Sequence, residues 1–205
     1  MPRKFALLLA FAAFLAAALA PSAGAMDLER LIAPASACAG QNDANAPIAA
    51  QEQTMRCLGN YARERFGMGS LGDADDLDRS ARDKAGDILR CDSFSHYACG
   101  RDFTYWMERV GYTSGSCWRA GENIAWGSGD LGSPSEIFRA WMHSPEHREN
   151  ILGHYSQVGI GLEVGGLEGR SDVHVWTQHF GSHCGAPGRT AAPHLAQLAA
   201  ARAVG

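Results

Sequence analysis

The chain has no excess of positive charge. Its 205 residues include 18 Lys and Arg against 22 Asp and Glu, which gives a net charge of −4 at pH 7. Removal of an N-terminal segment that holds Arg3 and Lys4 and no acid would take the net charge from −4 to −6. A mildly acidic surface argues against a nucleic-acid partner and against charge-driven binding to anionic lipid.

After its N-terminus, the sequence has no apolar run long enough to span a membrane. The N-terminus has the three parts of a secretory signal: two basic residues, an apolar stretch at 5–20 and a small-residue cleavage site, AGA, at 23–25. A membrane anchor is the alternative, but the stretch is shorter than the roughly 20 residues that a span needs. We expect residues 1–25 to be a cleaved signal peptide and the protein to be secreted, extracellular and without a transmembrane anchor.

No CxxC pair, the spacing typical of a cysteine metal site, occurs in the sequence. All six cysteines follow the signal, and an even number in an exported protein indicates three disulfide bonds. Several pairings are possible, and we favour a short loop closed by one pair, with two longer-range pairs: Cys91–Cys99, Cys38–Cys57 and Cys117–Cys184.

Helical periodicity is concentrated in the first half of the chain, and strand alternation in the second. Helices are expected at 27–32, 51–66, 74–90, 101–110, 133–141 and 144–153. Two strands, 158–164 and 173–180, are expected to form a hairpin. This order predicts an α+β layered domain without internal repeats. We expect an N-terminal arm at 26–50, one domain at 51–184 and a poorly ordered, flexible tail at 185–205.

The GxSxG motif of a serine-hydrolase nucleophile is missing as well. Ser95 adjoins His96, and neighbouring side chains generally point apart. A Ser-His-Glu hydrolase is therefore disfavoured.

Four short segments stand out instead: FSH at 94–96, GENIAWG at 121–127, AWMHSPEHRENIL at 140–152 and WTQHFG at 176–181. They carry two imidazoles and a carboxylate, His96, Glu122 and His147, spaced about 25 residues apart. Such wide spacing predicts a pocket that is assembled by folding rather than one face of a single helix.

These segments, with VGIGL at 158–162, resemble the CAP superfamily, the SCP or pathogenesis-related-1 type of domain, and its short bacterial secreted branch in particular. The resemblance covers residues 51–184. It implies a three-layer α-β-α sandwich with an antiparallel sheet and a central cavity. In many members of the family, two histidines and two glutamates line this cavity and can hold a divalent metal such as zinc.

Three of these four family positions match His96, Glu122 and His147. A rival for the second histidine, His154, lies in GHYSQ, but it is only 4 residues before Val158, whereas His147 lies 11 before it. The family spacing favours His147. We therefore expect His96, Glu122 and His147 to line the cavity and to be the candidate ligands for zinc or another divalent metal.

The fourth family position departs from the pattern. Ser144 stands three residues after Trp141, where a glutamate would complete the set. A metal would then have three protein ligands, with water or a neighbour such as His143 as the fourth. This is either a catalytic type of zinc shell or a weak site that is often empty.

The remaining polar residues of these segments have structural interpretations. We expect Glu122 to lie in a partly buried loop and to pair with His147 and His96. Asn123 and Gln178 are further candidate residues of the cavity: Asn123 is expected to hold loop backbone, and Gln178 to orient a cavity group or to bond to backbone. His147 lies at the start of a helix expected to be capped by Ser144, so its imidazole should be neutral. Core positions are expected for Trp141, Trp176 and Phe180, and surface or packing positions for His143, His174, His179 and His183.

Three functions fit this sequence. The first is a secreted binding or interaction module for a small lipid, a glycan, a peptide or a partner protein. The second is a metal-assisted extracellular hydrolase of peptide or cell-wall bonds; its weakness is that Glu122 cannot easily be both ligand and base. The third is a structural envelope protein with a vestigial cavity. We favour the binding module over an enzyme and name no catalytic residue.

Overall fold

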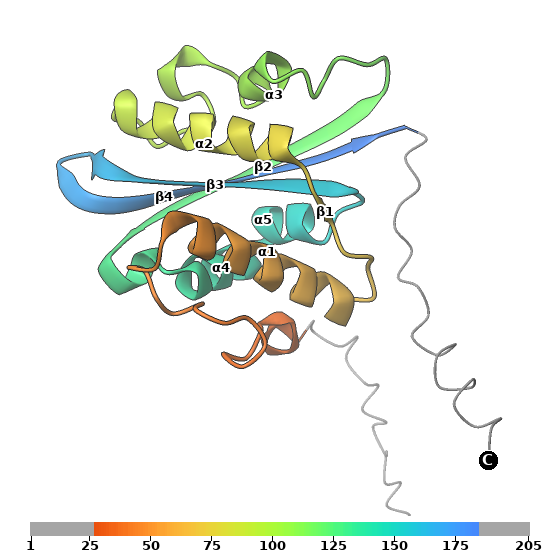
Figure 1. The fold of residues 1–205 in the computed structure, drawn as a ribbon, viewed down its shortest axis with the longest axis vertical. Helices are drawn as coiled ribbons and strands as arrows, with labels where there is room; N and C mark the ends of the chain where they lie inside the picture. The colour runs from red at the N-terminus through yellow and green to blue at the C-terminus, as the bar shows by residue number, and fades with distance from the viewer. Residues whose placement is uncertain (1–26, 185–205) are drawn as a thin grey trace, which may run out of the picture.

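The structure is a computed structural model that describes residues 27–184 (Figure 1). The expected signal peptide at 1–25 and the tail at 185–205 lie outside the described residues. None of the described helices is long and apolar enough to cross a membrane.

A four-stranded sheet forms the middle layer, in the order β1-β3-β4-β2. The helices α2 and α3 cover one face, and α1, α4 and α5 cover the other (Figure 1). This is the predicted α+β sandwich of three layers. The sheet is mixed rather than purely antiparallel, because the two-residue strand β1 pairs in parallel with β3, while β3, β4 and β2 pair antiparallel. The strands are β1 (Gly72–Asp73), β2 (Trp118–Ser128), β3 (Gln157–Leu167) and β4 (Arg170–His183).

The helices follow the apolar periodicity of the sequence closely. They are α1 (Ile48–Arg65), α2 (Asp75–Arg90), α3 (Tyr105–Arg109), α4 (Pro134–His143) and α5 (Pro145–Ile151). The expected helix at 27–32 is a 3-10 helix, Leu28–Leu31, and α3 is half the expected length. Two further 3-10 turns are Ala98–Gly100 and Gly129–Gly132. Both Ser133 and Ser144 precede a proline at a helix start, but neither side chain makes the expected capping hydrogen bond.

The segment GENIAWG forms most of strand β2, so its interpretation as a loop was wrong. The strand is hard to recognise because two glycines interrupt it, and glycine is depleted in strands. Both glycines are required by close approach. A Cβ on Gly127 would lie 2.1 Å from the carbonyl oxygen of Leu131, and one on Gly121 would lie 2.5 Å from the hydroxyl of Tyr155.

Helix α2 lies directly on strand β3. A Cβ on Gly159 would lie 2.1 Å from the backbone of Leu77, and one on Gly161 would lie 2.3 Å from the backbone of Ala81. At these two glycines, the backbone of α2 therefore lies directly against the backbone of β3. On the opposite face, the main core contains the three aromatic residues expected there, Trp141, Trp176 and Phe180.

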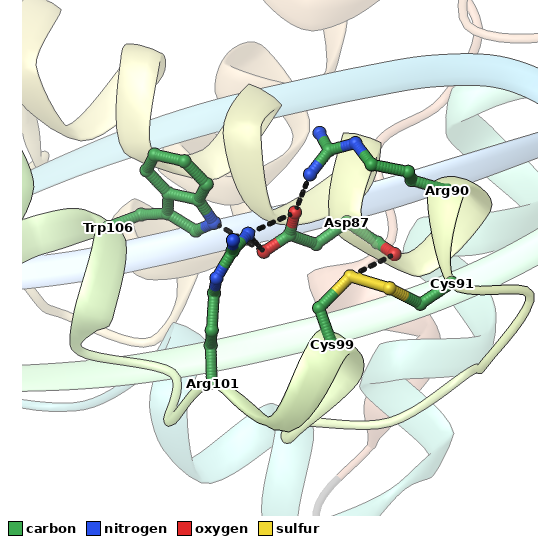
Figure 2. The surroundings of a disulfide bond; sticks show 6 residues. All are labelled: Asp87, Arg90, Cys91, Cys99, Arg101 and Trp106. Carbon is green, nitrogen blue, oxygen red and sulfur yellow. Dashed lines mark hydrogen bonds and ion pairs between the residues drawn. A yellow bond between two sulfur atoms is a disulfide. The ribbon is translucent and has the colours of Figure 1, made fainter.

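The three disulfide bonds are those predicted: Cys38–Cys57, Cys91–Cys99 and Cys117–Cys184. Cys91–Cys99 closes the loop that carries His96. Its neighbour Asp87 is fully buried and accepts hydrogen bonds from Arg90, Arg101 and the indole of Trp106 (Figure 2). The disulfide and this buried carboxylate together anchor both ends of the loop to α2 and to the start of α3.

Candidate functional site

The site is built on β2, which is an edge strand of the sheet. Glu122 lies on the face of β2 that is covered by α2, and His179 of β4 is its partner in the antiparallel register. The loop after α2 brings His96 to the same place, and α5 brings His147 to the open edge of β2. We call His96, Glu122, His147 and His179 the edge cluster.

Both carboxylate oxygens of Glu122 are bound by imidazoles. His96 Nδ1 lies 2.5 Å from Oε1, and His179 Nε2 lies 2.9 Å from Oε2. The side chain of Glu122 is only 2% exposed, whereas that of His96 is 48% exposed. The structure therefore confirms the pairing with His96, and gives the second hydrogen bond to His179 rather than to His147.

His179 was expected to have a surface or packing role, but it is fully buried at the centre of this cluster. Its Nδ1 lies 2.7 Å from the hydroxyl of Ser80, which also lies 2.9 Å from the carbonyl of Leu77. The order Ser80, His179, Glu122 is reminiscent of a hydrolase triad. Ser80 and His179 both have no exposed surface, so no substrate reaches the hydroxyl. The chain of hydrogen bonds therefore holds Glu122 in place and is not a nucleophile relay.

A buried lysine completes the surroundings of the carboxylate. Lys84 of α2 is 1% exposed and donates a hydrogen bond of 2.5 Å to the backbone carbonyl of His96. Burial lowers the pKa of Lys84, and the charge of Glu122 acts in the opposite direction. Lys84 thus fixes the loop that carries His96 and supplies a positive charge near Glu122.

Glu122 is ionised in this setting. Burial by itself raises the pKa of the carboxyl, but the hydrogen bonds from His179 and His96 and the charge of Lys84 outweigh it, so that the pKa is lowered from 4.5. An ionised carboxylate whose two oxygens are both engaged is a hydrogen-bond acceptor. With only 2% of its side chain exposed, it also has little contact with solvent water, which a general base in hydrolysis must reach.

His147 is the member of the edge cluster that helix α5 supplies. Burial lowers the pKa of its imidazole, and the charge of His96 lowers it further, so the ring favours the neutral form. This agrees with the neutral state expected from the sequence. No hydrogen bond joins the His147 ring to Glu122 within the described part of the chain; the pairing that we expected between them is not found.

An amide network joins α5 to β2. Asn123 Nδ2 donates to the carbonyl of His147 at 3.0 Å and to Gln178 Oε1 at 3.2 Å, and Asn150 Nδ2 donates to Asn123 Oδ1 at 2.9 Å. Asn123 therefore holds backbone, as expected, although that backbone belongs to a helix. Gln178 accepts from a side chain rather than from backbone.

These donors do not fit a ready metal site. A zinc ion would need nitrogen and oxygen ligands at about 2.0–2.2 Å, but His96 Nδ1 and Glu122 Oε1 face one another at 2.5 Å, which leaves no room for an ion between them. Across residues 27–184, no group of three or more His, Cys, Asp and Glu side chains is arranged to hold a metal ion. His143, a possible substitute ligand, faces Glu29, with 3.9 Å between Nε2 and Oε1. A metal held by His96, Glu122 and His147 stays a prediction, and binding would require Glu122 to give up hydrogen bonds.

A hollow lies elsewhere on the described surface, where β2 begins and β4 ends. Its volume is about 760 Å³, and its lining includes Arg63, Trp118, Arg119, His154, Tyr155 and His183. A second hollow of about 520 Å³ shares Arg119, His154 and Tyr155 with it. The rejected metal candidate His154 thus lines a groove next to the edge cluster.

The fold and site define a three-layer α-β-α domain with histidines gathered around one buried glutamate. The model of the CAP family, described as the cysteine-rich secretory protein family, matches residues 58–180. The chain therefore belongs to this family.

The chain is similar to proteins of several bacteria. It is 33% identical over 153 residues to the uncharacterized protein YkwD of Bacillus subtilis (strain 168), covering 72% of this chain and 54% of that protein, or about half of its length. The fold is similar to that of an extracellular protein containing an SCP domain from Bacillus anthracis (TM-score 0.50, 21% identity, 64% of this chain and 40% of that one). It is also similar to that of an outer surface protein from Borrelia burgdorferi (TM-score 0.54, 16% identity, 67% of this chain and 96% of that one).

Proposed function

We propose that the chain is a secreted binding or interaction module, with the edge cluster as part of its binding surface. Its ligand would be a small lipid, a glycan, a peptide or a partner protein. Secretion is supported by the signal-like N-terminus and by the similarity of the fold to one protein described as extracellular and to another described as an outer surface protein.

One observation carries the choice of binding over catalysis: the two oxygens of Glu122 are engaged by His96 and His179. A general base must have an oxygen or nitrogen within reach of the proton that it takes. Both oxygens of Glu122 already accept from imidazoles and its side chain is only 2% exposed, so water has little access to it, and Ser144 provides no second carboxylate. The cluster is instead a rigid set of donors and acceptors, which is what a binding site needs.

The loop around His96 adds the apolar part of such a surface. Phe94 is 37% exposed and Tyr97 is 66% exposed, and they flank a half-exposed imidazole. Exposed aromatic rings with a polar group beside them are typical of binding surfaces. Cys91–Cys99 closes this loop, so its backbone loses little entropy when a ligand binds.

The test is recovery of a ligand from the full chain, expressed with its own N-terminus and purified after export. We expect mass spectrometry to find a small molecule or peptide with the wild type and much less of it with His96→Asn. His143→Asn is the matched control, since His143 is similarly exposed but faces Glu29. Equal recovery from all three proteins, or no ligand from any of them, would contradict the proposal.

A further inference from the structure

The groove at the beginning of β2 has an unusual charge for this protein. Its lining includes two arginines and two histidines, Arg63, Arg119, His154 and His183, and no Asp or Glu. The whole chain has a net charge of −4. The formally charged residues of this lining are the two arginines, and such a groove on an acidic protein is the arrangement expected for binding an anion.

The first cation, Arg63, is buried at the floor of the groove with 2% of its surface exposed. Its Nε donates to the carbonyl of Gly69 at 2.8 Å, and its Nη1 donates to the carbonyls of Ile151 and Gly153 at 2.9 and 2.8 Å. Within the described residues, Nη2 has no hydrogen-bond partner and no carboxylate pairs with this guanidinium. A buried charge without a counter-ion is costly. Because the guanidinium of Arg63 is planar and already held at Nε and Nη1, its Nη2 is left to donate to an oxyanion.

The second cation, Arg119, is exposed at the rim and makes no ion pair within residues 27–184. The second hollow is lined by one acidic residue, Glu149, together with Arg148. The anionic group is therefore placed in the first hollow, between Arg63 and Arg119.

An aromatic residue lies next to this cationic pair. Trp118 precedes Arg119 on β2, lines the same groove and is 40% exposed. Tyr155 also lines it, next to Arg119. An exposed indole offers a flat apolar face, and arginine offers two parallel donors to a carboxylate or phosphate. The combination fits a ring-shaped ligand that carries an oxyanion.

We propose that this groove binds an anionic ligand with a ring-shaped body, an acidic sugar being the simplest example, with its oxyanion held by Arg63 and Arg119 and its ring against Trp118. The proposal rests on the proposed binding function and assigns it a second site, separate from the edge cluster. A carboxylate and a phosphate group share the required chemistry, and the test distinguishes them.

The experiment is an NMR titration of the purified secreted chain with glucuronate, glucose and inorganic phosphate, observing the backbone N–H signals of residues 118 and 119, which every variant retains. We expect glucuronate to bind and glucose not to bind at the same concentration. Arg119→Gln should weaken glucuronate binding by about fivefold or more, and Arg119→Lys by less. Trp118→Ala should weaken glucuronate but not phosphate, and added salt should weaken both anions.

Arg139→Gln is the control, because it removes the same charge from α4, where Arg139 faces Glu29. Arg63 is left unchanged, since its hydrogen bonds hold the floor of the groove. Equal binding of glucose and glucuronate, an equal effect of Arg139→Gln and Arg119→Gln, or binding of phosphate alone would overturn the proposal. The anion titration can fail while His96→Asn still lowers the recovery of a ligand by mass spectrometry. That outcome would rule out the anion site in the groove and would leave the proposed binding function in place.

Discussion

Replacement of Glu122 by glutamine tests the buried cluster directly. The change keeps the size of the side chain but removes its charge and one acceptor. A hydrogen bond to a charged group contributes about 1.5–3 kcal/mol, and Glu122 makes two of them, to His96 and His179. The amide can still accept from His179, while half-exposed His96 can turn towards water. We expect a loss of about 2–4 kcal/mol in the free energy of unfolding at pH 7.

The assay is urea unfolding with the disulfides intact, comparing midpoints at equal slope. Glu64→Gln is the control: Glu64 is exposed on α1 and its side chain makes no hydrogen bond to the described residues, so its effect should be within about 0.5 kcal/mol. The pKa of Glu122 is lowered by the imidazoles and Lys84. Its stabilisation is present above the unfolded pKa and is lost as the pH falls through the folded pKa. The gap between wild type and Glu122→Gln should therefore narrow below about pH 4.5. A gap under about 0.5 kcal/mol at pH 7 would refute this account of the cluster.

Three further changes test the framework that supports the site. Gly159→Ala should destabilise the protein by about 3 kcal/mol, because its Cβ would meet the backbone of α2. Gly59→Ala, which has open space around it on α1, should instead stabilise the protein by about 0.5–1 kcal/mol. Thermal unfolding should therefore show shifts of opposite sign for the two variants, and shifts of the same sign would contradict this. Burial and the charge of Glu52 raise the pKa of Glu163, so ionisation of Glu163 disfavours the folded state. Glu163→Gln should therefore raise the Tm at pH 7 and leave it unchanged at pH 3. An equal change of Tm at both pH values would contradict this. Joint replacement of Cys91 and Cys99 by serine should cost about 2–3 kcal/mol and increase hydrogen exchange in the loop of His96; unchanged exchange there would count against an anchoring role.

Much of the architecture could be predicted because it depends on local patterns. The apolar spacing of α2 and the alternation of β3 and β4 are visible in short windows, and they specify which faces are buried. The disulfide pairs followed from loop lengths and the export signal. The family resemblance then indicated which of the histidines to bring together, and the placement of His96 beside Glu122 agrees with it.

The parts that were missed depend on long-range pairing. The opposition of Glu122 and His179 arises only when β2 pairs with β4, and these residues are 57 positions apart. With the GENIAWG segment interpreted as a loop, no register existed that could place His179 beside Glu122. A lysine on a polar helix also gives no sign that it will be buried, and the role of Lys84 could be seen only in the folded chain.

The central claim is that Glu122 is a structural acceptor of a binding site and not part of a metal centre for hydrolysis. The number of zinc ions per chain, measured on the purified secreted protein and on His147→Ala, tests it most directly. Because no group of three or more His, Cys, Asp and Glu side chains within residues 27–184 is arranged to hold a metal ion, we expect far less than one zinc per chain in both proteins. One zinc per chain in the wild type that is lost in His147→Ala would contradict the claim and favour the metal-assisted hydrolase.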